Sequence, residues 1–163
     1  MPTIKLETII NAPADRVFDL ARSIDLHIES MSSSRERAVD GVVSGLIRAD
    51  QTVTWEAVHF GIRQRLTSKI TVCDRPWHLQ DVMVSGAFAG FVHDHFLEEQ
   101  DGTTTMRDVF VYRSPLSFLG QIADILFLER YMTQLLEERN QRIKKTAESE
   151  EWRKFLKDRP LSG

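Results

Sequence analysis

The chain has 163 residues, of which 42% are hydrophobic and 28% are charged, and its formal net charge is -3. These values fit one globular domain with a substantial core, and they give no general attraction for nucleic acid or an anionic membrane. The only cysteine is Cys73, which excludes an internal disulfide and a multi-cysteine metal site.

The first residues, MPTIKLETII, lack the basic stretch and long apolar run of a signal peptide, and the apolar segment 122–128 is too short to span a bilayer. We therefore expect a cytoplasmic protein without a membrane span and without a nucleic-acid partner.

The first forty residues predict one strand, two helices and a weak strand. Residues 3–10 alternate as a strand does, Asn11 offers a helix N-cap, and Pro13 falls in the first turn. Apolar residues then recur at helical spacing at Ala14, Val17, Phe18 and Ala21. Ser23 is expected to cap a second short helix, and residues 37–40 predict a weak strand.

Three further strands are expected between residues 52 and 84. Segments 52–59 and 62–72 alternate, and a tight turn at Phe60-Gly61 would place Trp55 opposite Leu66. The inner face of the second segment then carries Ile62, Gln64, Leu66, Ser68, Ile70 and Val72. In the third segment, 77–84, the alternation allows either Asp81 or Val82 to point inward, and both assignments stand.

The stretch FVHDHFLEEQDGTTTMRDVFVY, residues 91–112, predicts a hairpin with a two-residue turn at Asp101-Gly102. This turn fixes the register, and one side of the hairpin then carries the pairs Leu97–Met106, His95–Asp108, His93–Phe110 and Phe91–Tyr112. The apolar members show that this is the core side. Two histidines and one aspartate are therefore expected to face the interior.

A long helix is predicted at the C-terminal end, beginning near Ser114-Pro115. Its apolar stripe consists of Ile125, Leu128, Met132, Leu135, Leu136 and Ile143. We interpret the charges at 137–139 as a solvated face of this helix. Residues 1–147 are expected to form the domain and 148–163 a charged tail. The apolar segment 122–128 fits either a homodimer contact or burial under the sheet.

This order of elements is that of an α+β protein, in which a curved antiparallel sheet wraps around the last helix. The chain resembles the START/polyketide-cyclase superfamily in four stretches. These are IINAPADRVFDLARSID, VTWEAVHFGIRQRLTSKIT, GAFAGFVHDHFLEE and LGQIADILFLERYMTQLLEERNQRIK. This superfamily, also called SRPBCC, has the helix-grip fold of the birch pollen allergen. The resemblance covers about the first nine-tenths of the chain. It implies a hydrophobic cavity between sheet and helix, but no transferable catalytic residues.

Polar side chains on the predicted inner face support such a cavity. A core built for stability alone would gain from apolar residues at Gln64, Ser68, His59 and His95. We therefore predict that an apolar small molecule binds there, to Trp55, His59, Gln64, Leu66, Phe91, His93, His95, Phe110, Tyr112 and Leu128.

The facing residues His95 and Asp108 have two interpretations. They form either a buried bridge that fixes the hairpin register or an acid–base pair in the cavity wall, with Tyr112 as a further donor. Burial would lower the pKa of His95 and an ionised Asp108 would raise it. The alternative functions are a cyclase or dehydratase using this pair, and a protein-interaction module using the last helix or the tail at Trp152.

Metal and cofactor sites are not expected from the sequence. His93-x-His95 and His59 could supply three imidazoles, but the resemblance does not imply a metal-dependent protein. His27 and His78 are interpreted as surface or rim residues without partners. Cys73 has no histidine nearby in the strand scheme, which disfavours a nucleophile.

Overall fold

The computed structural model of the chain describes residues 1–114 and 127–157. A single seven-stranded sheet in the order β1-β7-β6-β5-β4-β3-β2 is antiparallel throughout. Its strands are β1 (Thr3–Ile10), β2 (Arg37–Gly41), β3 (Thr52–His59), β4 (Ile62–Asp74), β5 (His78–Ser85), β6 (Gly90–Gln100) and β7 (Thr103–Arg113). The helical elements are α1 (Ala14–Ala21), α2 (Ile24–Ser30), η1 (Ser32–Ser34), α4 (Glu129–Glu148) and α5 (Trp152–Leu156).

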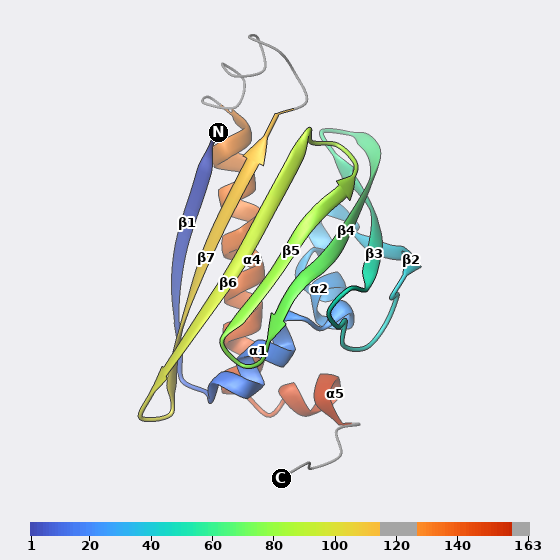
Figure 1. Cartoon of the computed structure of the whole chain (residues 1–163). Helices are drawn as coiled ribbons and strands as arrows, with labels where there is room; N and C mark the ends of the chain where they lie inside the picture. The colour runs from blue at the N-terminus through green and yellow to red at the C-terminus, as the bar shows by residue number, and fades with distance from the viewer. Residues whose placement is uncertain (115–126, 158–163) are drawn as a thin grey trace.

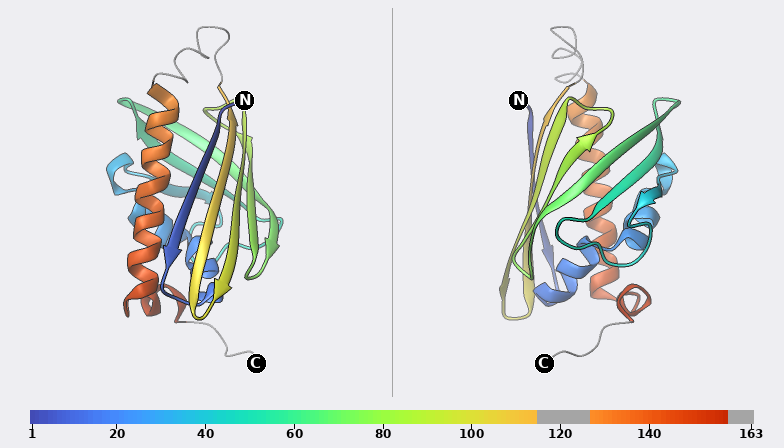
Figure 2. Two further views of the ribbon diagram at one scale, coloured as in Figure 1. Left: turned by 90° about the vertical axis from the view of Figure 1, so that its left-hand side faces the viewer. Right: turned by 45° about the vertical axis from the view of Figure 1, so that its right-hand side comes forward.

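The sheet curves around α4, which runs along its concave side (Figures 1 and 2). Helices α1 and α2 lie on the same side and contact α4, so the interior is enclosed between one sheet and three helices. This arrangement confirms the predicted α+β helix-grip architecture. No helix within residues 1–114 and 127–157 is long and apolar enough to cross a membrane.

Both predicted hairpin registers are confirmed. Trp55 pairs with Leu66 across β3 and β4, and His95 pairs with Asp108 across β6 and β7. The turn residues Asp101 and Gly102 have positive φ values of 52° and 78°. Turns of this hand match the twist of the two strands, so the Asp-Gly pair fixes the register that brings the polar residues to the interior.

Two predictions for strand β4 are wrong, namely that Ile62 and Val72 lie on the buried inner face. Ile62 is 62% exposed because this end of the strand extends beyond the packed core. The pairing with β5 shifts between Ile70 and Val72, which pairs with Gln80. Because a bulge reverses the alternation, Val72 leaves the inner face and Cys73 packs against the core instead.

The helix starts differ in how they are capped. Ser23 accepts a hydrogen bond from the Leu26 N–H (3.2 Å), which confirms its predicted capping role. Asn11 is not the cap of α1, because Pro13 occupies that position. The N–H of Ala14 instead donates to Glu99 of β6 (2.7 Å), so a side chain from the sheet satisfies the helix end.

In the C-terminal region the structure describes residues 127–157, which include α4 and α5. In the tail, α5 packs against α1, and its Leu156 is buried with the core. The predicted start of the long helix at Pro115 and the stripe residue Ile125 lie outside the described residues, as does most of segment 122–128. The homodimer contact and the division at residue 147 therefore stay predictions.

Candidate functional site

A cavity of about 500 Å³ lies between the concave face of the sheet and helices α2 and α4. Its wall is mostly apolar and includes residues of β3, β4, β5, β6, β7 and α4. This volume falls in the range of small-molecule sites, which are typically apolar with a few placed polar groups. The lining contains such groups in two places, a polar end formed by side chains of β5, β6 and α4 and a second set around His59 and Tyr131.

All predicted ligand-binding residues except Tyr112 line this cavity. They are Trp55, His59, Gln64, Leu66, Phe91, His93, His95, Phe110 and Leu128. Tyr112 is fully buried, and its ring lies 5.7 Å from the rings of Phe88 and Phe110, both of which line the cavity. It therefore supports the aromatic wall from behind.

Asp108 of β7 is the centre of a buried polar cluster formed with His93, His95, Arg139 and Asn140. His93 Nε2 donates to Asp108 Oδ1 (3.0 Å), and Asn140 Nδ2 donates to Asp108 Oδ2 (2.6 Å). His95 Nδ1 lies 2.6 Å from Asp108 Oδ1, although the angle is poor for a hydrogen bond. Three donor groups thus surround one carboxylate that is 1% exposed.

The protonation states in this cluster follow from burial and from these contacts. Burial alone would raise the pKa of Asp108, but the interactions with His95 and His93 outweigh it and hold that pKa far below the usual range. Burial lowers the pKa of His93 and of His95 despite the carboxylate. These directions favour an ionised Asp108 between two neutral imidazoles.

Arg139 of α4 connects this cluster to the helical layer. Its Nη2 donates to the carbonyl oxygen of Ala21 (2.8 Å), and its Nη1 donates to His95 Nε2 (3.4 Å). The residue is 9% exposed, so the predicted solvated face at 137–139 is wrong for Arg139. Arg139 and Asn140 follow Leu135 and Leu136 by four residues, and this spacing is the signal that places both on the buried face.

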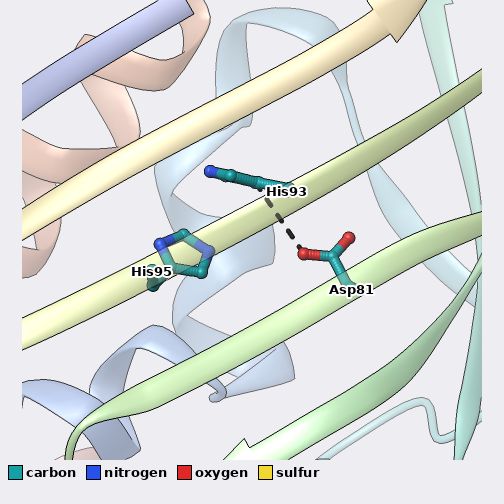
Figure 3. A group of neighbouring side chains, drawn as sticks. All are labelled: Asp81, His93 and His95. Carbon is teal, nitrogen blue, oxygen red and sulfur yellow. Dashed lines mark ion pairs between the residues drawn. The ribbon is translucent and has the colours of Figure 1, made fainter.

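Asp81 of β5 is the site residue whose orientation the sequence left open. It pairs directly with His93 across β5 and β6 and points into the cavity. Figure 3 shows its carboxylate facing the two imidazoles of β6, with Asp81 Oδ1 3.8 Å from His93 Nδ1. Burial raises the pKa of Asp81, and the neighbouring His93 only partly opposes this effect.

The opposite wall of the cavity carries a second set of polar contacts. His59 Nδ1 lies 2.7 Å from the hydroxyl of Tyr131, and burial lowers the pKa of His59. His27 contacts Glu36 (2.9 Å) and its ring lies 4.2 Å from that of Trp55. His27 therefore has a partner that the sequence did not identify. His59 lies with Tyr131 and does not join the histidines of β6.

The comparisons with known proteins concern the fold. No protein-family model and no curated protein matches the chain. The structure of TTHA0849 from Thermus thermophilus is similar with a TM-score of 0.71 at 18% identity, covering 90% of this chain and 99% of that one. Ara h 8.0201 (TM-score 0.64, 14% identity) and major latex-like protein 151 from Panax ginseng (0.60, 11%) each match 90% of this chain and 97% of theirs. The chain shares the helix-grip fold of these structures.

Proposed function

We propose that the protein binds an apolar small molecule, such as a lipid, polyketide or isoprenoid quinone, in the cavity beneath α4. The observation that carries this proposal is the cavity itself: about 500 Å³ with a mostly apolar wall and a polar end. A close-packed interior normally contains few voids larger than a water molecule. A space of this size with a mostly apolar wall favours an apolar occupant.

The polar end of the cavity gives the bound molecule an orientation. His95 and Arg139 line the wall there, whereas the rest of the lining is dominated by side chains such as Leu66, Leu135 and Phe110. A ligand with one oxygen-bearing end and an apolar body satisfies both parts of this wall. A fully apolar ligand would gain no polar contact at this end of the wall.

The matched residues Ala57 and Val58 of β3 provide a test. Ala57 lines the cavity, whereas its neighbour Val58 is outside the lining and pairs with Arg63. Ala57→Phe places a ring in the cavity, and we expect it to weaken binding of Nile red by at least about tenfold. Val58→Phe should leave binding unchanged. The proposal fails if both variants bind the dye as the wild type does, or if the purified protein and added lipids never form a complex.

A cyclase or dehydratase activity is the alternative, and the position of His95 in the cavity wall favours it. Against it, His95 Nδ1 faces Asp108 and Nε2 accepts from Arg139, so neither nitrogen faces a ligand without rearrangement. Mass spectrometry of molecules that co-purify with wild type and with His95→Gln separates the two functions. Binding predicts the same molecule in both, and an enzyme predicts an unreacted substrate in the variant only.

A further inference from the structure

Three side chains of the kind that bind transition metals converge at the polar end of the cavity. Asp81 of β5 and His93 and His95 of β6 each offer one ligand atom, and these atoms lie within 4.8 Å of one another (Figure 3). The sequence suggested His59 as the third ligand, but β5 supplies a carboxylate in its place. Two imidazoles and one carboxylate are a recurrent set for divalent ions of the first transition row.

Asp108 fixes which nitrogen of each imidazole is free to bind an ion. It accepts from His93 Nε2 (3.0 Å), which leaves the lone pair of His93 on Nδ1, the atom 3.8 Å from Asp81. It faces His95 Nδ1 (2.6 Å), which leaves the lone pair of His95 on Nε2. A carboxylate behind a histidine in this way is the usual second layer of a metal site, because it holds the ring and its tautomer in place.

The charges around the three side chains also favour a cation. Two carboxylates lie beside the imidazoles, the buried Asp108 and the Asp81 side chain, which is 21% exposed, and the cation that contacts His95 is Arg139. A divalent ion would compensate the carboxylates in a place that water reaches poorly. The Arg139 contact with His95 Nε2 is long at 3.4 Å, so an ion can replace this donor.

We propose that Asp81, His93 and His95 bind one divalent transition-metal ion, with Asp108 as the residue that positions both imidazoles. Ligand atoms about 2.1 Å from an ion in a tetrahedral site lie about 3.4 Å apart, so the present separations of up to 4.8 Å need to shorten by about 1.4 Å at most. The remaining coordination positions face the cavity. The ion thereby provides a Lewis-acidic contact for an oxygen of a bound molecule.

This proposal goes beyond the binding of an apolar ligand and does not depend on it, because metal binding is measured on delipidated protein with the ion alone. Tag-free protein is stripped with a chelator and titrated with Co²⁺, whose visible absorption reports nitrogen coordination. We expect saturation at one Co²⁺ per chain, and competition by Zn²⁺. Asp81→Asn keeps the shape of the side chain and should weaken Co²⁺ binding by about 10–100-fold.

The same strands contain a matched control. Asp94 of β6 contacts His78 of β5 (2.6 Å) on the outer face, and Asp94→Asn should leave Co²⁺ binding unchanged. Arg139→Met removes the competing donor from His95 and is expected to tighten Co²⁺ binding severalfold. The proposal is overturned if folded wild type does not bind Co²⁺ stoichiometrically, if Asp81→Asn binds as wild type does, or if Asp94→Asn loses binding equally.

Discussion

The outer face of β5 and β6 and the inner face of β6 and β7 carry the same chemical groups in two different environments. On the outer face His78 contacts Asp94 at 2.6 Å, and the two side chains are 26% and 17% exposed. On the inner face His95 lies 2.6 Å from Asp108, and both side chains are 1% exposed. The distances are equal, and the two pairs differ in hydrogen-bond angle, which is poor in the inner pair, and in their access to water.

Access to water determines how much each pair contributes to the stability of the fold. If the outer pair is broken, both groups are solvated again, so its contribution to stability is small. If the inner pair is broken, the remaining groups stay buried without a partner. The two pairs also differ in their access to a ligand, because the inner imidazoles face a cavity from which a ligand can displace water. The outer ring of His78 instead stacks on Phe96 at 4.4 Å.

Removing the two carboxylates one at a time tests this comparison with the largest expected effect. Asp108→Ala leaves the donors of His93, His95 and Asn140 buried without an acceptor, so it should lower the free energy of unfolding by about 3–5 kcal/mol. Asp94→Ala should lower it by about 0–1 kcal/mol. Urea denaturation of both variants gives the two values, and similar losses would show that burial does not separate the faces.

The dependence of stability on pH provides a second test, performed with a chelator present. His93 and His95, which face Asp81, Asp108 and Arg139, have pKa values lowered by burial, so the folded state binds fewer protons than the unfolded chain. Stability from these groups is present above their ordinary pKa of about 6.5 and is lost as the pH falls. Asp108, whose pKa is also lowered, acts only below about pH 4.

We therefore expect the free energy of unfolding to decrease between pH 7.5 and 5, with each buried imidazole contributing up to about 1.4 kcal/mol per pH unit. His93→Gln should reduce this slope, because one titrating group is removed. Denaturation curves at several pH values measure it. A wild-type slope near zero in this window would mean that folding does not shift the pKa of the inner imidazoles.

The sequence was sufficient to predict the inner side of β6 and β7 because a two-residue turn and strict alternation determine a hairpin register. It was insufficient for Asp81 because the ladder between β4 and β5 contains two register shifts, which periodicity does not reveal. Arg139 was misread for a different reason. Its charge suggested solvent, although its spacing from Leu135 places it on the buried face and a carbonyl of α1 accepts from it.

Strand β4 offers the test with the smallest expected effect, because its two ends were predicted to share one buried face. Ile70 is 5% exposed and belongs to the core, whereas Ile62 is 62% exposed. Ile70→Thr loses apolar contacts and buries a hydroxyl, so it should cost about 2–3 kcal/mol in the free energy of unfolding. Ile62→Thr should change it by less than about 0.5 kcal/mol. If urea denaturation instead gives equal losses, this end of β4 is covered in solution, and the packed core extends further along the strand than the structure shows.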